Sequence, residues 1–355
     1  MSPRVMPLSL ALALAALVVL GAGAVVLART TRTRPFPRQQ PFVVRPLALE
    51  SGGRWIGDAV AYGPHRDGQR PRGVEPTVAQ VREDLRLLSK DWHLLRIYGA
   101  IGTGDTVLRA IREEKCGTKV VLGLWLDAEE RRDSTGRVVE RFPKARAANR
   151  RDVERAIQHA RHHPDLVAAI TVGNETQVYW SANRLPAETV IAYIREVRAR
   201  TRVPVSTADD FNFWNKAESR AIAAECDFVF THLHPLWNGQ QLEEALPWIE
   251  RNLAEIRAVH PDREVVIGET GWATMHNDQG DQGKLMKGAV GEREQAEFYR
   301  ALRAWIARTR VPTFVFEAFD ENWKGSPDPA EVEKHWGLYR ADRTPKLAMQ
   351  REENR

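Results

Sequence analysis

The sequence predicts one α/β domain, a closed (β/α)₈ barrel, behind a hydrophobic N-terminal segment. From Trp55 onward, short apolar runs rich in β-branched residues alternate eight times with amphipathic stretches of helical period. The runs are almost continuously apolar, which is typical of parallel strands covered on both faces by helices. Eight such units in about 300 residues favour a closed barrel over an open doubly wound sheet. No glycine-rich phosphate-binding motif follows the first run, so a nucleotide-binding fold loses its main support.

The predicted strands begin and end where the apolar runs do. They span residues 55–62, 93–99, 119–126, 166–175, 203–210, 227–235, 264–270 and 311–321. A last short strand or edge segment is expected over 335–340.

The predicted helices fill the intervals between the strands. Pro76 and Thr77 open the first, over 78–88, and Asp105 is the expected cap of the second. The others are expected over 151–162, from about 186, and over 216–225, 241–259 and 292–308. A polar, Arg-rich insertion over 127–148 lies in the third unit. It is predicted to be a solvated loop, with a lid or a contact for an acidic partner as the alternative.

Composition argues against several classes of protein. The formal net charge is +5 and the pI is near 9.3, but no basic stripe is interleaved with aromatic residues, so nucleic-acid binding is not expected. Cys116 and Cys226 precede the third and sixth predicted strands, far apart around a barrel. Two buried free thiols are therefore expected rather than a disulfide. No GxSxG elbow is present, which removes the main sign of acyl transfer.

Polar residues collect at the carboxyl ends of the last five predicted strands. They are Asn174 and Glu175 in the fourth, Asp209 and Asp210 in the fifth, His232, His234 and Trp237 at the sixth, Glu269 and Trp272 at the seventh, and Glu317, Asp320, Glu321, Trp323 and Lys324 at the eighth. In a (β/α)₈ barrel these ends meet on one face, where active sites lie. Any one of these residues could be an ordinary loop cap, but the set indicates a site.

Two of these carboxyls suit the cleavage of a glycosidic bond with retention of configuration. That reaction needs two carboxyls about 5–5.5 Å apart across the sugar. The fourth and seventh strands lie three steps apart in an eight-strand ring, so Glu175 and Glu269 can face each other across its mouth. We expect a partly apolar surround and the opposed negative charge to favour protonated Glu175. Donated hydrogen bonds should keep Glu269 ionised.

An ordered series of motifs accompanies the predicted strands, namely AYGPHRDGQRP (61–71), LRIYG (95–99), ITVGNE (170–175), STADDFNFW (206–214), HLHPLWNG (232–239), VVIGETGWAT (265–274), FEAFDENWKG (316–325) and HWGLY (335–339). This series resembles glycoside hydrolase family seventeen, the β-1,3-glucanase family, and its bacterial branch in particular. NE and GETGW alone are moderately specific, whereas the whole series is highly specific. The resemblance runs from about Trp55 to Tyr339.

The resemblance implies roles for individual residues. Glu175 would be the acid/base, Glu269 the nucleophile, and Asn174 would bind near the sugar 2-hydroxyl. Glu321 and Lys324 would support the nucleophile side. The other expected substrate-binding residues are Tyr98, Asp209, Asp210, His234, Trp237, Trp272, Glu317 and Trp323. The implied substrate is β-1,3-linked glucan, attacked by double displacement, with transfer to a second sugar nearly as well supported as hydrolysis. A non-catalytic glycan-binding or envelope-scaffold protein is the alternative.

One segment departs from the family pattern. His234 and Leu236 flank Pro235 where aromatic residues are usual in the family, which leaves the shape of the subsite and the pH profile open. His232 and His234 share one face of a strand and could in principle hold a metal ion. Catalytic zinc needs a third protein ligand, and no HExxH or similar partner accompanies them. We therefore expect no metal and no cofactor.

Tryptophan is abundant, with 11 residues. Six lie near predicted strand ends or the loops after them, namely Trp125, Trp180, Trp214, Trp237, Trp272 and Trp323. Flat apolar rings cover the C–H faces of sugars, so two or three of the six are expected to be stacking platforms. Trp248 and Trp305, on predicted helices, are assigned to the core.

The N-terminus predicts export. The apolar run over 8–28 is long enough to cross a bilayer and longer than the usual core of a cleaved signal. We expect a signal peptide or signal anchor over 1–28, an Arg/Pro-rich tether over 29–50 and the barrel over 51–350. Four Arg after the run would favour a cytoplasmic domain, but a polysaccharide substrate favours the periplasm or cell envelope. An inner-membrane anchor is slightly preferred, and a monomer is expected.

Overall fold

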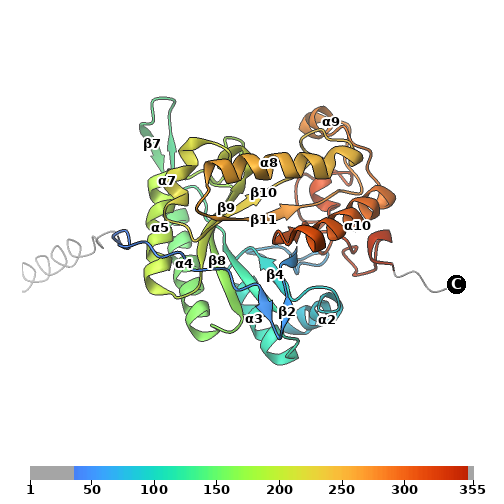
Figure 1. Ribbon diagram of the computed structural model, residues 1–355, viewed down its shortest axis with the longest axis horizontal. Helices are drawn as coiled ribbons and strands as arrows, with labels where there is room; N and C mark the ends of the chain where they lie inside the picture. The colour runs from blue at the N-terminus through green and yellow to red at the C-terminus, as the bar shows by residue number, and fades with distance from the viewer. Residues whose placement is uncertain (1–35, 351–355) are drawn as a thin grey trace, which may run out of the picture. The chain divides into compact units, whose positions relative to one another are not determined.

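The computed structural model describes residues 36–350. Their centre is a closed barrel of eight parallel strands in the order β10-β11-β12-β3-β4-β5-β8-β9 (Figure 1). The strands are β3 Asp58–Ala61, β4 Leu94–Ile97, β5 Lys119–Leu124, β8 Val167–Asn174, β9 Val205–Asp210, β10 Phe228–His232, β11 Glu264–Thr270 and β12 Thr313–Val315. The order around the ring follows the chain, so the predicted (β/α)₈ barrel is confirmed.

Helices surround the barrel. They are α2 Val78–Leu88, α3 Thr103–Glu114, α4 Pro143–His162, α5 Ala187–Arg200, α6 Phe211–Trp214, α7 Arg220–Ala223, α8 Ala245–Val259, α9 Gly280–Leu285 and α10 Glu292–Thr309. The first begins at the predicted residue because Thr77 and Gln80 form a reciprocal capping box. Asp105, expected to be a cap, is instead the third residue of α3, and its carboxylate accepts from the N–H of Gly102.

The largest difference from the predicted elements follows β9. Only the 3₁₀ helix η1 (Ala217–Ser219) and the short α7 lie within the helix expected over 216–225, and a further short helix, α6, precedes them. Asp210 starts α6 early because its carboxylate accepts from the backbone N–H of Asn212. Lys216 then adopts an extended conformation, which ends helical hydrogen bonding before η1.

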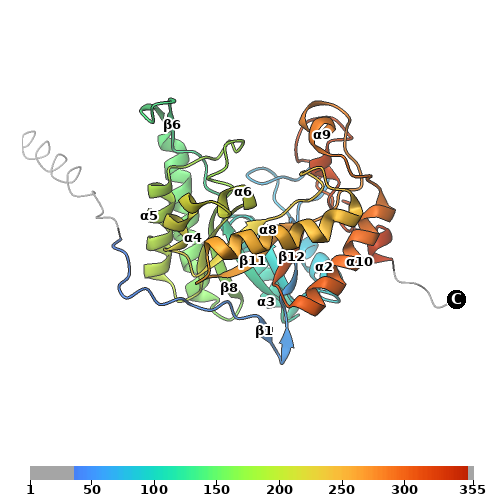
Figure 2. The same cartoon turned by 45° about the horizontal axis from the view of Figure 1, so that its top comes forward.

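Two segments rise above the carboxyl ends of the strands. The insertion after β5 is partly ordered as an antiparallel hairpin of β6 Glu130–Arg132 and β7 Val138–Arg141, and its last residues join α4. The segment after β11 contains α9, which was not predicted. Figure 2 shows the hairpin and α9 on opposite sides of this face of the barrel. Residues 335–340 form only isolated bridges, Phe319 with Tyr339 and Tyr339 with Pro345.

The buried side chains separate into two clusters, as the alternation of strand residues requires. Inside the barrel lie small and aromatic residues such as Ala169, Phe230 and Phe314. The alternate residues, for example Val229 and Ile267, pack outward against the helices. Trp248 and Trp305 belong to this outer cluster, as predicted.

Residues 38–49, which were assigned to the tether, lie along the amino ends of the strands. We call this segment the strap. Arg45 donates its backbone N–H to Asp227, which precedes β10, and its side chain donates to carbonyls of Val203 and Arg198. Leu47 of the strap joins the cluster inside the barrel. The strap thus belongs to the same compact unit as the barrel, a unit that begins at Arg38.

Both cysteines in the described part of the chain are free thiols. Cys226 is buried as expected, but Cys116 is only half-buried because it lies in the loop before β5. The apolar run over 8–28 lies outside the described residues. Among residues 36–350, none of the helices is long and apolar enough to cross a membrane.

Candidate active site

A cleft of about 1360 Å³ opens at the carboxyl ends of the strands. Both predicted catalytic residues, Glu175 and Glu269, line it. Aromatic side chains line much of the rest, and α9 contributes Asp281 and Leu285 to one wall. The two carboxyls therefore share one face of the barrel and one cavity.

Glu175 follows the last residue of β8. Its backbone lies in the left-handed region, with φ near +49°, and its N–H donates to the carbonyl of Ala208 on β9. A residue with a Cβ occupies this region at a cost that the surrounding structure must offset, and such positions are common at functional sites. The side chain is 29% exposed and borders the cleft.

Glu269 is buried near the end of β11, and three side chains form hydrogen bonds to its carboxylate. Arg96 Nη1 and the Tyr98 hydroxyl lie 2.8 and 2.9 Å from Oε1, and His234 Nε2 lies 3.2 Å from Oε2. His232 Nε2 is 3.4 Å from Oε1. Burial alone would raise the pKa of Glu269, but the charge of Arg96 and the hydrogen bond from His234 lower it far below its usual value. Glu269 is thereby held as a carboxylate.

His232 lies between the two acidic residues. Its Nδ1 is 2.9 Å from Oε1 of Glu175, and its Nε2 faces Oε1 of Glu269. The imidazole is fully buried, so its position is fixed by the barrel interior. Glu175 and Glu269 therefore stand at opposite edges of one five-membered ring.

A second charged cluster follows β12. Lys324 Nζ contacts both carboxylate oxygens of Glu317, at 2.7 and 2.8 Å, and also lies 2.8 Å from Glu321. Burial, and then the charge of Glu321, raise the pKa of Glu317 in spite of Lys324. Burial would also raise the pKa of Glu321, but Lys324 and His65 lower it. A Cβ on Gly63 would lie 2.3 Å from the carboxylate of Glu321, so only glycine fits this close approach.

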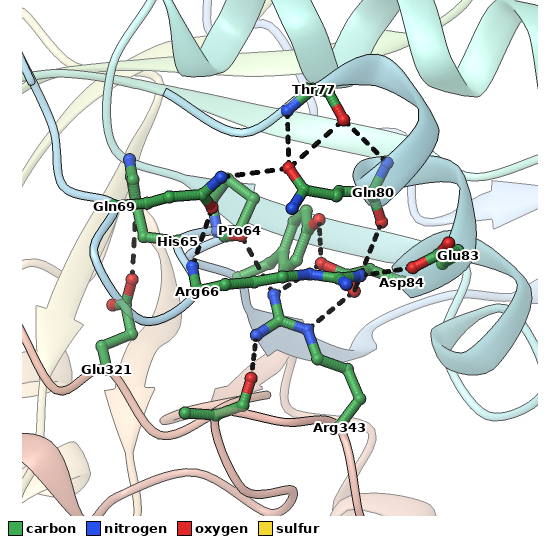
Figure 3. Close-up of polar contacts among 12 residues, drawn as sticks. Pro64, His65, Arg66, Gln69, Thr77, Gln80, Glu83, Asp84, Glu321 and Arg343 are labelled. Atoms are coloured by element: carbon green, nitrogen blue, oxygen red, sulfur yellow. Dashed lines mark hydrogen bonds and ion pairs between the residues drawn. The ribbon is translucent and has the colours of Figure 1, made fainter. Parts of the chain in front are cut away.

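The loop after β3 is fixed by a buried carboxylate, Asp84 of α2 (Figure 3). Asp84 is fully buried and accepts from Arg66, Arg343 and the Tyr62 hydroxyl. Arg343 also donates to the carbonyl of Pro64. These contacts hold the segment from which His65 reaches Glu321, at 3.4 Å.

The predicted site residues fall into two groups. Lining the cleft are Tyr98, Asn174, Glu175, Asp210, His234, Trp237, Glu269, Glu321, Trp323 and Lys324. Asp209, Trp272 and Glu317 do not line it. Asp209 is fully buried, where it accepts from the N–H groups of Gln177 and Asp210, and Glu317 is fully buried against Lys324. These two residues brace the wall of the cleft.

Trp272, expected among the substrate-binding residues, does not reach the cleft. It is 1% exposed, its Nε1 donates to the carbonyl of Ala289, and its ring packs near Phe298. Trp214 is buried in the same way, with its Nε1 on the carbonyl of Phe230. Of the six tryptophans singled out in the sequence, Trp125, Trp180, Trp237 and Trp323 line the cleft.

Sequence reasoning missed several residues of the site. Arg96 is 1% exposed and joins Asn174, His232 and Glu269 through its guanidinium. The signal was an arginine within the apolar run LLRI. Glu333, two residues before HWGLY, lines the cleft, and burial raises its pKa. Among residues 36–350 we find no cluster of three potential metal ligands.

The fold and the site define a carbohydrate-cleaving enzyme, a glycoside hydrolase built on a (β/α)₈ barrel. Residues 59–337 match the family model of the BtgE/BtgC glycoside hydrolase domain. The chain belongs to this family, which is of the family-seventeen type that the sequence motifs indicated.

Individual proteins agree with this assignment. A glucan 1,3-beta-glucosidase of Arthroderma benhamiae is 30% identical over 296 residues, covering 79% of this chain and 87% of the relative. An endo-laminarinase from Formosa has a similar fold, with a TM-score of 0.68, 23% identity, and coverage of 82% of this chain and 86% of that one. A family-seventeen β-1,3-glucanosyltransferase from Rhizomucor miehei also has a similar fold, with a TM-score of 0.63 and 19% identity. The match covers 82% of this chain and 96% of that one.

Proposed function

We propose that the protein cleaves β-1,3-linked glucan with retention of configuration and passes the glycosyl group to water or to a second sugar. The observation that carries the proposal is the pair of carboxyls, Glu175 and Glu269, held on the two edges of His232 in one cleft. The substrate class comes from the relatives, which are named as glucosidases, a laminarinase and a glucanosyltransferase of β-1,3-glucan.

In the first step Glu269 attacks the anomeric carbon while Glu175 gives its proton to the leaving oxygen. The bond from that carbon to the leaving oxygen breaks, and a covalent glycosyl-enzyme forms. The low pKa of Glu269 suits this role because the nucleophile must be ionised. In the second step Glu175, now a carboxylate, takes a proton from water or a sugar hydroxyl, whose oxygen displaces Glu269.

Asn174 is suited to bind the sugar beside the reacting carbon. Its Oδ1 accepts from Arg96 at 2.6 Å, which orients the side-chain amide and leaves the Nδ2 hydrogens for a ligand. We assign these hydrogens to the 2-hydroxyl of the sugar. A hydrogen bond at that hydroxyl strengthens in the transition state and adds several kcal/mol in this class of reaction.

The aromatic lining supports transfer as a serious competitor of hydrolysis. Tyr179 and Trp180 lie in the loop that follows Glu175 and are 80% and 49% exposed at the rim of the cleft. Large exposed apolar side chains of this kind mark binding surfaces. On this side of Glu175 they are placed to hold the leaving sugar or an incoming acceptor, and an occupied acceptor site excludes water.

Incubation with laminari-oligosaccharides tests the proposal. Shorter products indicate hydrolysis and longer ones indicate transfer, whereas intact sugars would support a binding or scaffold protein. Glu269→Ala should abolish turnover and leave glucan binding largely intact, as measured by calorimetry. Normal turnover by that variant would refute the role of Glu269, and Glu175→Ala provides the same test for the acid/base.

We further propose that the enzyme is exported and works in the periplasm or cell envelope as a monomer. A polymeric glucan outside the cytoplasm supports this location. Cell fractionation of the full chain, with detection of the N-terminal segment in the mature protein, distinguishes a retained anchor from a cleaved signal. Recovery of the protein in the cytoplasm would contradict the proposal.

A further inference from the structure

We infer that His232 is a positioning residue for proton transfer: it reserves one carboxylate oxygen of Glu175 for the glycosidic oxygen. The inference rests on the proposed function, in which Glu175 is the acid/base. It concerns a residue whose two ring nitrogens make different contacts, and those contacts determine where the protons lie.

The first step is the tautomer of His232. Its Nε2 lies 2.9 Å from Nη1 of Arg96, closer than the 3.4 Å to Glu269. A guanidinium only donates hydrogen bonds, so we assign Nε2 as the acceptor of this contact, with no hydrogen of its own, and Nη1 shares its two N–H groups among Nε2, the carbonyl of Gly268 and Glu269. The neutral ring therefore has its proton on Nδ1. Arg96 is fixed in turn by the carbonyl of Gly268 and by Asn174.

The second step is what Nδ1 does with its proton. Nδ1 lies 2.9 Å from Oε1 of Glu175, so the N–H donates to that oxygen. Oε1 can keep this bond whether Glu175 is a carboxylate or a neutral acid, provided that the acid proton is on the other oxygen. In the described part of the chain, Oε2 of Glu175 makes no hydrogen bond, and the side chain borders the cleft.

It follows that the transferable proton resides on Oε2. In the first half-reaction Oε2–H donates to the leaving oxygen, and in the second Oε2 accepts the proton of the incoming water or sugar. Because His232 is fully buried, Glu175 is held in the same orientation through both steps. No rearrangement of the imidazole is needed when the proton leaves or returns.

Other charged groups face Glu175 but do not replace this contact. Asp209 and Asp210 of β9 lie beside Glu175. Glu269, His234 and Glu333 lie on the other side of the cleft. The acidic members of this set cannot donate when ionised. His234 makes its hydrogen bond to Glu269. His232 thus makes the one hydrogen bond to the Glu175 carboxylate found within residues 36–350.

Dependence on the leaving group tests the inference. A laminari-oligosaccharide needs acid assistance to depart, whereas a 2,4-dinitrophenyl β-glucoside does not. For His232→Ala we expect kcat/KM to fall about 100-fold on the oligosaccharide and less than about fivefold on the activated glucoside. In His232→Asn the amide nitrogen takes the place of Nδ1, so this variant should recover most of the lost activity on the oligosaccharide. His234→Ala, which removes a hydrogen bond to Glu269 and none to Glu175, should lower kcat/KM on both substrates alike.

Equal losses on both substrates for His232→Ala, or no loss on either, would overturn the inference. So would an ¹⁵N NMR spectrum of labelled enzyme showing the hydrogen of His232 on Nε2, or on both nitrogens. Circular dichroism of each variant checks that it is folded. Glu175→Ala distinguishes failure of the role of His232 from failure of the proposed function. If it shows the leaving-group dependence and His232→Ala does not, the inference alone fails. If Glu175→Ala has normal activity on the oligosaccharide, the proposed function fails.

Discussion

Nη1 of Arg96 on β4 lies 2.8 Å from Oε1 of Glu269 on β11, and both side chains are buried although β12 and β3 separate their strands in the barrel. A buried ion pair is stable only when further hydrogen bonds satisfy its atoms. Here Tyr98 and His234 also donate to the carboxylate, and Gly268 and Asn174 accept from the guanidinium. The arrangement keeps the buried nucleophile ionised.

Replacing Arg96 should make the nucleophile titrate in the measurable range. Because the pKa of Glu269 is lower in the folded protein than in the unfolded chain, the ionised carboxylate stabilises the fold above the unfolded-state pKa. This stabilisation is lost as the pH falls through the folded-state pKa. Arg96→Met removes the charge, so the pKa of Glu269 should rise and the acidic limb of kcat/KM should move to higher pH. The pH profile of kcat/KM is the measurement.

Arg96→Lys is the control for folding, since it keeps a charge but cannot reach Asn174, His232 and Glu269 together. It should retain the acidic limb near its original position while losing activity. A uniform loss of activity in Arg96→Met, with no movement of the acidic limb, would contradict the role assigned to Arg96.

Asp210→Asn should stabilise the protein at alkaline pH. Burial is the main cause that raises the pKa of Asp210 to about 6, and the charge of Glu175 adds to it. A carboxyl whose pKa is raised in the folded protein contributes stability below its unfolded-state pKa of about 3.9. This stability is lost as the pH rises through the folded-state pKa. Asparagine keeps the cap on α6 without the charge. We expect a gain of at most about 3 kcal/mol in the free energy of unfolding at pH 8 and little change at pH 3.5.

Urea unfolding at the two pH values measures this difference. Asp281→Asn is the matched control, because Asp281 also lines the cleft but its side chain is 82% exposed. Its effect should stay within about 0.5 kcal/mol. Loss of stability by Asp210→Asn at pH 8 would show that its carboxylate is needed in the charged form.

Trp180→Ala, alone or with Tyr179→Ala, should shift the products from transfer toward hydrolysis. The two rings lie 4.9 Å apart at the rim of the cleft, beyond Glu175. Loss of one aromatic ring that stacks on the sugar should weaken acceptor binding and leave the catalytic carboxyls in place. The ratio of elongated to shortened oligosaccharides should fall several-fold at fixed substrate concentration. Val139→Ala, exposed on the β6–β7 hairpin and outside the cleft lining, should leave the ratio unchanged.

Asp84→Ala should destabilise the domain strongly. Its carboxylate is fully buried and compensates Arg66 and Arg343, which would be left without their shared partner (Figure 3). Breaking a buried pair of this kind costs about 3–5 kcal/mol. Glu83→Ala is the neighbouring control. Glu83 is 59% exposed and pairs only with Arg66 at the surface, so its loss should cost less than about 1 kcal/mol. Equal effects of the two substitutions on urea unfolding would contradict this account.

The barrel and the ends of its strands could be predicted from the sequence because each apolar run stops at polar residues. Glu175 and Glu269 are identifiable in this way, since both close a run. Arg96 was not found because a charged residue inside an apolar strand is usually read as a surface position. Its burial depends on partners from β8, β10 and β11, far away in the sequence. The residues next to Arg96 in the sequence therefore do not indicate that it is buried.

Neighbouring residues illustrate the same limit. Asp209 and Asp210 were treated alike, but consecutive strand residues point to opposite sides. Only Asp210 faces the cleft, while Asp209 is fully buried. Trp237 and Trp272 both follow strand ends, yet Trp272 is covered by the segment leading to α10. Which aromatic ring remains uncovered depends on how a long loop folds back, and α9 in that loop was not predicted.

The position of the strap has a practical consequence for handling the enzyme. Because residues 38–49 run beneath the barrel and Leu47 closes its floor, the polypeptide enters the domain from the end remote from the catalytic mouth. A contact made with residues 38–49 would therefore leave the cleft open to the bulk solution, where a long, insoluble polymer could approach it. A truncation that starts at residue 51 would instead remove the floor.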